Sequence, residues 1–249
     1  MNVGRSTLNE GKQMKNIVVI GATGDVGAGI VTELLKSGHR VVASSRGAAK
    51  LDALKSTLAT HGRLEAVAGS VASESEARAL LEGVRRCVDR IDAVVSCFNM
   101  PITNMPLLQR SADDLADELK GNLVAHFAAA KVFIPAVAQG GIYLAIGGGK
   151  ADIIVPGSGV MAICQAGQRN MFRMIARENR GGPVLIRELI LYSTIAGASN
   201  RDKAEPSWIT AEEAGRHVLA VLADPATFAG PILALKSRAQ VGSPEEPAK

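Results

Sequence analysis

The sequence predicts an α/β fold in which a doubly wound, mostly parallel sheet of seven strands lies inside a three-layer α/β/α sandwich. Of the 249 residues, 47% are hydrophobic and 21% are charged, which is typical of a globular domain. Aromatic residues make up only 3%, while glycine occurs 26 times, so the layers must pack through small and branched side chains. Short apolar runs also alternate with segments of helical periodicity along most of the chain, which favours a parallel sheet over a β-sandwich.

The first strand–helix–strand unit is the clearest of these alternations. Residues 17–20 form a wholly apolar, β-branched run, as expected for a strand buried on both faces. Apolar residues then recur at helical spacing from Ile30 to Leu35, until Ser37 and Gly38 end the helix. A second strand is expected at residues 41–43. The same reasoning predicts a helix at 49–60, a strand at 64–68, a helix at 73–88 and a strand at 93–96.

The second half of the chain continues the pattern after a loop that contains Pro101 and Pro106. Thr210 and Glu213 have the spacing of a capping box at the start of the last helix. The expected elements are helices at about 111–134, 155–179 and 210–223, and strands at 142–146, 184–191 and 231–235. No linker divides the chain, so we expect a flexible lead-in at 1–16, one domain at 17–241 and a flexible tail at 242–249.

Charge and cysteine usage exclude several classes of protein. The net charge is +4 and the basic residues are scattered, so the sequence does not indicate nucleic-acid binding. Cys87, Cys97 and Cys164 are odd in number and far apart, without a CxxC motif or a histidine cluster. They predict neither a disulfide framework nor a metal site, and buried, inert thiols are the expected state. A reducing cytoplasm is the expected compartment.

The sequence shows no targeting or membrane segment. Its first sixteen residues are polar and lack the apolar core of a secretory signal. The most apolar stretch, residues 123–138, is broken by His126, Lys131 and Pro135, and its apolar residues follow a helical spacing. We therefore expect no membrane partner.

A glycine-rich loop joins the first strand to the first helix. Gly21 allows a tight turn, Gly24 allows the backbone to approach a pyrophosphate, and Gly27 allows the helix to pack closely on the strand. The helix N-terminus would then present free amide groups and a positive dipole end to the phosphates. Because strand, loop, helix and second strand occur in register, the loop predicts a Rossmann-type dinucleotide site rather than a simple turn.

The end of the second strand predicts which dinucleotide binds. An NAD site usually places an acidic residue there, on the ribose 2′-hydroxyl. This chain has Ser44, Ser45 and Arg46 instead. A guanidinium and hydroxyls suit a 2′-phosphate, so the sequence favours NADP over NAD, although Arg46 could also simply begin a solvated loop.

From about Lys15 to Leu235 the chain resembles the short-chain dehydrogenase/reductase family. Beyond the glycine loop, the resemblance is carried by residues 92–99, by Gly121-Asn122-Leu123, by residues 173–178 and by residues 210–230. The glycines at 21, 24 and 27 are spaced as in the atypical and extended members. The resemblance implies the doubly wound fold, a nicotinamide cofactor, hydride transfer to or from a small molecule, and a homodimer or homotetramer formed through the helices at 111–134 and 155–179.

The family's catalytic serine, tyrosine and lysine are missing. When the family pattern is anchored on residues 173–178, Gly148, Met161 and Gln165 occupy their positions, and only Asn122 of the tetrad remains. Methionine cannot exchange protons, and glutamine cannot supply the positive charge that lowers a phenol pKa. Neither tyrosine of the chain has a lysine four residues later, so the absence does not depend on the register.

Other residues are candidates for the missing functions. Tyr192 follows the carboxyl end of a strand and could donate a proton, although it could also only pack at the rim of the cleft. Lys150 and Asp152 follow a glycine cluster and could supply polar groups, whereas His126 is expected to be a satisfied interior residue. The catalytic candidates are therefore Asn122 and Tyr192. The cofactor-binding candidates are Gly21, Thr23, Gly24, Asp25, Val26, Gly27, Ser45, Arg46, Ser70, Cys97 and Thr194.

Three functions remain open from the sequence. The first is an NADP(H)-dependent oxidoreductase with a rebuilt proton-transfer arrangement, which suits reduction of a conjugated double bond or an imine because the cofactor carries the hydride chemistry. The second is a non-catalytic protein that binds or senses NADP(H). The third is a non-redox isomerase or cyclase that reuses the cleft. The substrate would be a small organic molecule in each catalytic case.

Overall fold

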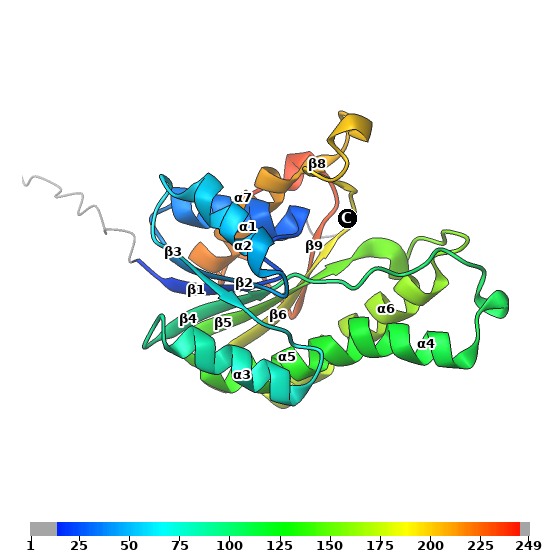
Figure 1. Ribbon diagram of the computed structural model, residues 1–249, viewed down its shortest axis with the longest axis horizontal. Helices are drawn as coiled ribbons and strands as arrows, with labels where there is room; N and C mark the ends of the chain where they lie inside the picture. The colour runs from blue at the N-terminus through cyan, green and yellow to red at the C-terminus, as the bar shows by residue number, and fades with distance from the viewer. Residues whose placement is uncertain (1–13, 245–249) are drawn as a thin grey trace, which may run out of the picture.

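The computed structural model describes residues 14–244 and places one central sheet between two layers of helices (Figure 1). The sheet contains seven parallel strands in the order β3-β2-β1-β4-β5-β6-β9, which confirms the predicted doubly wound fold. The order of the strands reverses between β1 and β4, where open α/β sheets bind their ligands. The strands are β1 (Asn16–Ile20), β2 (Arg40–Ser45), β3 (Leu64–Ala68), β4 (Ile91–Ser96), β5 (Val137–Gly148), β6 (Leu185–Leu191) and β9 (Ile232–Leu235).

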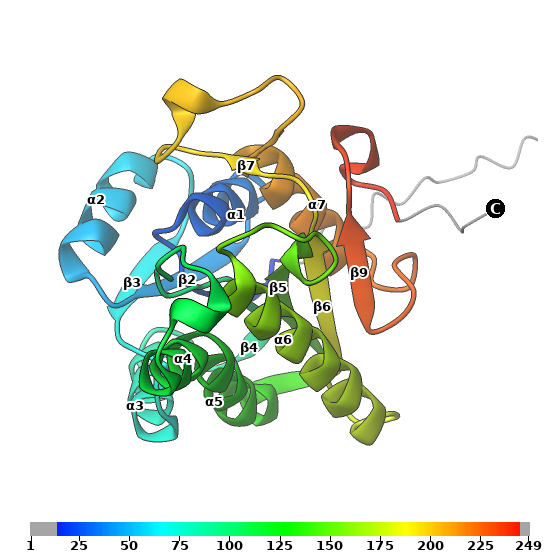
Figure 2. The same ribbon diagram turned by 90° about the vertical axis from the view of Figure 1, so that its right-hand side faces the viewer.

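The helices cover the two faces of this sheet. One face carries α1 (Asp25–Lys36), α2 (Ala48–Leu58) and α7 (Ala211–Ala223), and the other carries α3 (Glu74–Arg85), α5 (Ala125–Phe133) and α6 (Gly159–Glu178) (Figures 1 and 2). Alternate residues of β1 pack in opposite layers, because successive strand side chains point to opposite faces. Ile17 belongs to the core under α1 and α7, while Val18 belongs to the core under α3 and α5.

The helix predicted at 111–134 is interrupted in the structure. It consists of α4 (Ala112–Leu119), a π-helical turn (Lys120–Val124) and α5, and it ends in a 3₁₀ turn that contains Pro135. A π-helical turn inserts one extra residue into the helix and is common at functional sites. Apolar periodicity continues through such a turn, so the sequence pattern did not reveal it.

Other boundaries also differ from the expected ones. β5 extends over 137–148 rather than 142–146, and α6 begins at Gly159 rather than at about residue 155. The short pair β7 (Ile195–Ala196) and β8 (Ile209–Thr210) was not predicted, since two residues are too few to show alternation. The capping box of Thr210 and Glu213 is present in full. It fixes the start of α7, which packs along α1.

The two ends of the chain were predicted to be a lead-in and a tail. β1 begins at Asn16, one residue earlier than expected, while residues 1–13 and 245–249 of these segments lie outside the described residues. Within residues 14–244, no helix combines the length and the apolar character that a membrane span needs. The same residues contain no group of three metal-ligating side chains.

Candidate active site and cofactor cradle

The glycine-rich loop leaves β1 in a conformation that only glycine adopts easily. Gly21 has a φ of +88°, and a Cβ on it would lie 2.8 Å from the carbonyl carbon of Cys97. A Cβ on Gly27 would lie 2.9 Å from the carbonyl carbon of Gly21, so α1 approaches the loop closely. The loop is therefore compressed against β4 and α1, as the assigned glycine roles require.

Helix α1 begins in this loop without a side-chain cap. Gly24 is the N-cap residue, and no side chain accepts a hydrogen bond from the first turn. The amide groups at the start of α1 are thus available to an anion, which the helix dipole also favours. The Asp25 carboxylate is bound by Ser199, which donates from its backbone amide and its hydroxyl. This contact ties the residue 197–200 segment to the loop.

The residues predicted to select the cofactor lie beside this loop. Ser45 is the last residue of β2, and Arg46 follows it with an exposed side chain that contacts the Met100 sulfur. Ser70 lies just beyond β3, where its hydroxyl accepts a hydrogen bond from the amide of Ala72. Because all these strands are parallel, their carboxyl ends share one edge of the sheet with the glycine loop. The cradle therefore fits a dinucleotide. The Arg46 guanidinium and the Ser45 hydroxyl lie at the end of β2, and the Ser70 hydroxyl lies beyond the neighbouring β3.

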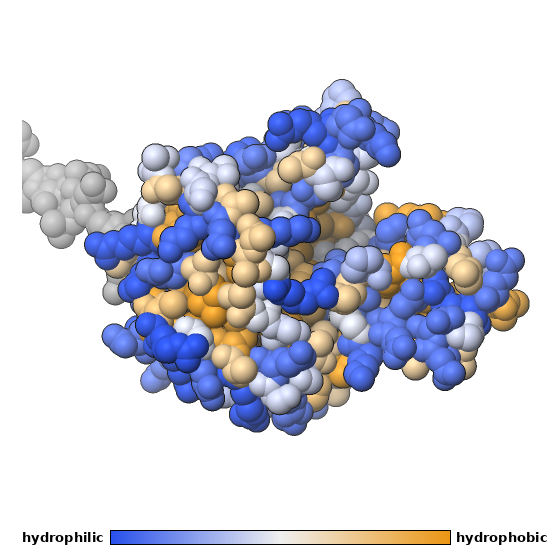
Figure 3. Space-filling view, in the orientation of Figure 1, coloured by the Kyte–Doolittle hydropathy of each residue, from blue (hydrophilic) through white to orange (hydrophobic). Residues whose placement is uncertain are grey.

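A cleft of about 440 Å³ opens at the same edge, over the carboxyl ends of β4, β5 and β6. Figure 3 shows the molecule hollowed between the lobe around residues 197–209 and the lobe around α4. Of the residues singled out in the sequence, it is lined by Val26, Cys97, Gly148, Lys150, Gln165, Tyr192 and Thr194. Its remaining lining is mostly apolar and includes Ile146, Ile153, Val155 and Leu191.

The positions of the missing catalytic residues are only partly brought together. Gly148 ends β5 and Gln165 lies on α6, and a Cβ on Gly148 would lie 2.8 Å from Cδ of Gln165. The Gln165 amide oxygen also accepts a hydrogen bond of 2.8 Å from the amide of Lys150. Met161 is half-buried in the first turn of α6 and does not line the cleft. Positions 148 and 165 are therefore in contact, whereas position 161 lies outside the cleft lining.

Tyr192 faces the cleft but its hydroxyl is already engaged. It donates a hydrogen bond of 2.5 Å to Asp152, whose carboxylate is held by two hydrogen bonds from Arg169 at 2.9 and 2.8 Å. Arg169 and Tyr192 lower the pKa of Asp152 to about 2. Burial and the Asp152 carboxylate raise the pKa of Tyr192. The phenol therefore keeps its proton near neutral pH, unlike a phenol that a lysine activates.

Asn122 lies in the π-helical turn and is buried away from the cleft lining. Its amide oxygen accepts a hydrogen bond of 2.8 Å from the amide of Met100, and its amide nitrogen donates to the carbonyl oxygen of Glu118 at 3.0 Å. Asn122 thus fastens the loop after β4 to the irregular helix. In this arrangement it positions neighbouring backbone and does not face the cleft itself.

His126 and the cleft cysteine show the expected inert environments. His126 is fully buried, hydrogen-bonds the carbonyl oxygen of Phe98 at 2.9 Å and stacks on the Phe98 ring, and burial lowers its pKa to about 4. The Cys97 thiol lines the cleft but donates toward the carbonyl oxygen of Ile20, and burial raises its pKa to about 12. Burial likewise raises the pKa of Cys164 to about 11. None of these groups is a reactive nucleophile at neutral pH.

Sequence reasoning missed part of the site. Asn99 and the apolar pair Ile153 and Val155 line the cleft, and Arg169 holds Asp152. Asn99 and the apolar pair follow β4 and β5, so their position after strands was a usable signal. No local pattern links Arg169 to Asp152, because the two residues belong to different elements and meet only in the folded chain.

Comparison with known proteins assigns the chain to a family. The model of the family described as enoyl-(acyl carrier protein) reductase matches residues 21–240. The chain belongs to the short-chain dehydrogenase/reductase family. Its oxidoreductase-type fold and nucleotide-binding Rossmann architecture are those of this family. Among curated protein sequences, none matches the chain.

Solved structures of this family are similar in fold but distant in sequence. A short-chain dehydrogenase/reductase from Serratia marcescens has a TM-score of 0.79 and 19% identity, over 90% of this chain and 97% of its own. An alcohol dehydrogenase from Thermococcus sibiricus, complexed with 5-hydroxy-NADP, has a TM-score of 0.78 and 17% identity, over 95% and 100% of the two chains. An NADH-dependent reductase complexed with NAD has a TM-score of 0.75 and 18% identity, over 90% and 95%. The last two structures thus contain different nicotinamide cofactors, a modified NADP in one and NAD in the other.

Proposed function

We propose that this family member is an NADP(H)-dependent reductase of a small organic molecule, with a non-standard active site. The observation that carries the cofactor assignment is the end of β2. There Ser45 and the exposed guanidinium of Arg46 lie beside the glycine loop, and no carboxylate follows the strand. A guanidinium forms charge-assisted, bidentate hydrogen bonds with a phosphate, whereas the ribose 2′-hydroxyl of NAD is better bound by a carboxylate.

The cleft supports reduction without a tyrosine acid. When bound, the nicotinamide would supply the hydride. Lys150 is the one charged residue that lines the cleft within the described part of the chain, and its ammonium group lies 3.3 Å from the Ser158 hydroxyl. An ammonium group there would stabilise negative charge that develops on a conjugated carbonyl substrate, and water could protonate the product. Reduction of a conjugated double bond or an imine therefore suits this site.

The walls of the cleft favour a substrate with an apolar part. Ile146, Ile153, Val155 and Leu191 line it, and Ile154 at the same loop is 97% exposed. Apolar side chains on an open loop beside a polar catalytic edge can cover an apolar ligand when it binds. The substrate is therefore proposed to be a small molecule with an apolar body and one reducible polar end.

One observation favours a second candidate, a non-catalytic NADP(H)-binding or sensing protein. The one phenol that lines the cleft in the described residues is engaged elsewhere, because the Tyr192 hydroxyl donates its hydrogen bond to Asp152, and Gln165 at the lysine position cannot exchange a proton. Both a reductase and a sensing protein would bind NADP(H), and only the reductase would oxidise NADPH repeatedly in the presence of a substrate. Steady oxidation of NADPH with enones or imines supports the reductase, and tight binding without turnover across such a panel supports the sensor.

The cofactor assignment is tested with Arg46→Ala. Loss of a charge-assisted phosphate contact costs roughly 1.5 to 3 kcal/mol, so the variant should bind NADPH at least about tenfold more weakly and NADH almost unchanged, measured by calorimetry. Arg63→Ala is the matched control. Arg63 is an exposed arginine directly before β3, so it lies at the amino ends of the strands, whereas the cofactor cradle lies at their carboxyl ends. An equal loss of affinity for both cofactors would show that Arg46 does not read the 2′-phosphate.

The proposed assembly is a homodimer or homotetramer, and the proposed compartment is the cytoplasm. The three cysteines of the chain are all free, in keeping with a reducing compartment. Exposed apolar side chains on α5 and α6 support association, as argued below for Phe127 and its neighbours.

A further inference from the structure

Asp25 is the first residue of α1, at the point where the pyrophosphate of a dinucleotide would meet the helix N-terminus. The helix dipole favours a carboxylate in this position, but the carboxylate can also accept hydrogen bonds from the free amides of the first turn, and it repels a phosphate. The Asp25 side chain therefore competes for the amides that a cofactor needs. Its backbone can serve the cradle only if the carboxylate is held away from them.

Ser199 holds the Asp25 carboxylate from outside the helix. The backbone amide of Ser199 donates to Oδ1 of Asp25 at 3.1 Å, and the Ser199 hydroxyl donates to Oδ2. Within residues 14–244 these are the hydrogen bonds that the carboxylate accepts, and none comes from an amide of α1. Both carboxylate oxygens are thus engaged by a residue that is 174 positions away along the chain.

The 195–200 segment forms a turn that presents Ser199 to Asp25. The amide of Gly197 donates to the side-chain oxygen of Asn200 at 2.9 Å, and the Asn200 amide nitrogen donates to the carbonyl oxygen of Ile195 at 3.0 Å. A Cβ on Gly197 would collide with the Asp25 side chain, so the glycine allows the segment to approach the carboxylate. Ser199 therefore reaches Asp25 from a turn that is closed by its own hydrogen bonds.

The same turn is fixed to the pair of helices beside the cradle. β7 lies in this segment and pairs with β8, which ends at Thr210, the N-cap residue of α7. α7 packs closely on α1 at Gly29 and Gly215, where a Cβ on either glycine would collide with the backbone of the other helix. Packed backbone therefore sets the position of Ser199 relative to the start of α1.

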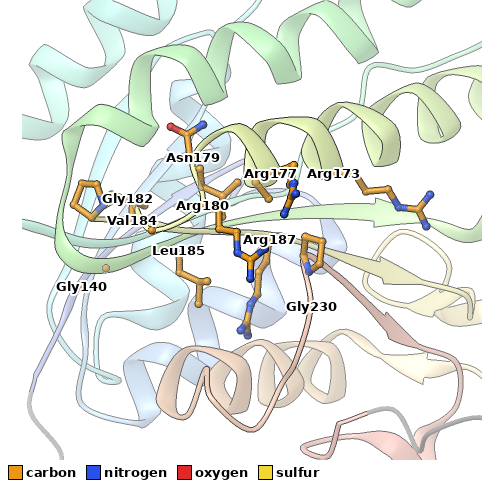
Figure 4. A pocket seen from close by; sticks show the side chains of 16 residues that line it. Gly140, Arg173, Arg177, Asn179, Arg180, Gly182, Val184, Leu185, Arg187 and Gly230 are labelled. Carbon is orange, nitrogen blue, oxygen red and sulfur yellow. The ribbon is translucent and has the colours of Figure 1, made fainter.

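A basic cavity of about 730 Å³ lies at the other ends of the strands, where β6 and β9 begin. Arg173, Arg177 and Arg180 line it from α6 and the turn after that helix (Figure 4). The C-terminal end of the helix dipole favours cations there, so these arginines need no bound anion. The buried Arg187 belongs to the opposite face of β6, with Leu189 in the core under α1 and α7. The amino ends of the strands therefore carry no counterpart of the amides at the start of α1.

We propose that Ser199 is a positioning residue for the cofactor, which draws the Asp25 carboxylate toward the 195–200 segment and leaves the first-turn amides of α1 free for the pyrophosphate. NADP and NAD share this pyrophosphate, so the effect is the same for both. This role of Ser199 rests on the proposed dinucleotide binding, but not on the choice of cofactor at Arg46. Because Thr194 lines the cleft directly before the segment, the contact also joins the substrate cleft to the phosphate side of the cradle.

A double-mutant cycle between Ser199→Ala and Asp25→Ala tests this role, with the affinities of the full-length protein for NADPH and for NADH measured by calorimetry. Ser199 is exposed, so its replacement leaves the core intact. Ser199→Ala should weaken the binding of both cofactors alike, by at least about threefold, because the carboxylate loses a charge-assisted hydrogen bond and is freed to turn toward the amides. The double variant should bind both cofactors more tightly than Ser199→Ala does, and Ser199→Ala should cost nothing in the Asp25→Ala background.

Ser207→Ala is the matched control, since Ser207 is an exposed serine a few residues further along whose hydroxyl forms no hydrogen bond in the described residues. It should bind both cofactors as the wild type does. An unchanged affinity in Ser199→Ala would overturn the proposal, as would a loss that persists in the Asp25→Ala background. A loss confined to NADPH would assign Ser199 to the 2′-phosphate and would overturn it too. These three results leave the proposed function in place, whereas a wild type that binds neither dinucleotide would overturn that function and the role of Ser199 together.

Discussion

The side chain of Gln165 occupies the space that a side chain at Gly148 would need. A Cβ at position 148 would lie 2.8 Å from Cδ of Gln165, which is closer than real Cβ atoms approach a neighbour. The backbone of Gly148 has a φ of −129° and a ψ of 162°, an extended conformation that any residue adopts. A side chain at 148 would therefore have to displace the Gln165 amide, which accepts a hydrogen bond from Lys150, and would not strain its own backbone. The two departures from the family pattern are physically coupled.

This coupling predicts a non-additive effect on stability. Gly148→Ser should lower the free energy of unfolding by about 1 to 3 kcal/mol, the usual cost of overpacking. In a Gln165→Ala background the same change should cost clearly less, because the clashing amide is gone. Urea denaturation of the four variants of the cycle measures the coupling. Equal costs in both backgrounds would show that the two side chains do not compete for space.

The same relationship explains why the catalytic residues must be restored together. The triple variant Gly148→Ser, Met161→Tyr and Gln165→Lys should create or raise reduction of simple ketones by NADPH. Each single change should do little, because such groups act as a unit. Met161 does not line the cleft, so the new tyrosine would have to reach it from the first turn of α6. A folded, NADPH-binding triple variant that reduces no ketone would mean that the anchoring on residues 173–178 is wrong or that the cleft suits other chemistry.

Tyr192 and Asp152 lead to a prediction about tyrosine titration. Asp152→Asn removes the carboxylate that helps to raise the pKa of Tyr192, so this phenol should ionise at lower pH than in the wild type. Ultraviolet absorbance of the phenolate during an alkaline titration measures the change. Tyr143, the other tyrosine of the chain, is fully buried and burial raises its pKa without a contribution from Asp152, so its ionisation should not change between the two proteins. An unchanged titration of Tyr192 would contradict the role of Asp152.

The sheet was predictable from sequence because its signals are local. The apolar run of β1, the glycines after it and the helical spacing of α1 follow one another without interruption, and each depends on neighbouring residues. The capping box at Thr210 and Glu213 is local in the same way, and it was predicted correctly. The positions of the cofactor-binding candidates along the sheet edge followed from these elements, because parallel strands end together.

The polar network around the cleft was not predictable, because its partners are distant in sequence. Tyr192 lies 40 residues from Asp152, and Arg169 lies 17 residues from it. Asn122 was identified, but its hydrogen bonds to the amide of Met100 and to the Glu118 carbonyl oxygen depend on a π-helical turn that apolar periodicity does not indicate. The buried Arg187 was likewise hidden in an apolar strand pattern. Such contacts arise from tertiary packing and leave no short-range signature.

The adjacent helices α5 and α6 predict how copies of the chain associate. Phe127 near the start of α5, Val124 just before it, and Ile163 and Met174 on α6 are between 40% and 51% exposed, so both helices carry large apolar side chains at the surface. The wild type should sediment as a dimer or tetramer at micromolar concentration. Phe127→Asp should shift it toward the monomer, because a charge would be buried in the interface. Leu108→Asp, at a fully exposed leucine in the 3₁₀ turn Leu107–Gln109, should not. A monomeric wild type would contradict the proposed assembly.

The buried carboxyl group of Glu188 predicts how stability depends on pH. Glu188 is fully buried on β6 and its two oxygens have no hydrogen-bond partner by geometry in residues 14–244. Burial raises its pKa from 4.5 to about 8, although Arg169, Gln168 and Arg173 favour the charged form. The folded protein thus binds this proton more tightly than the unfolded chain does. The resulting stabilisation is complete below pH 4.5 and is lost as the pH rises through about 8.

Glu188→Gln should remove this dependence, since the amide does not ionise. Relative to the wild type, the variant should therefore gain stability between pH 5 and pH 9, by at most roughly 4 kcal/mol because one pKa unit corresponds to about 1.4 kcal/mol and part of the effect is already lost at pH 5. Chemical denaturation at both pH values measures the difference, and titrations shared by the two proteins cancel in it. Glu178→Gln, at an exposed glutamate that ends α6, should show no such gain. If the stability difference between Glu188→Gln and the wild type were the same at both pH values, Glu188 would be charged throughout this range, and a neighbouring cation would have to neutralise it inside the fold.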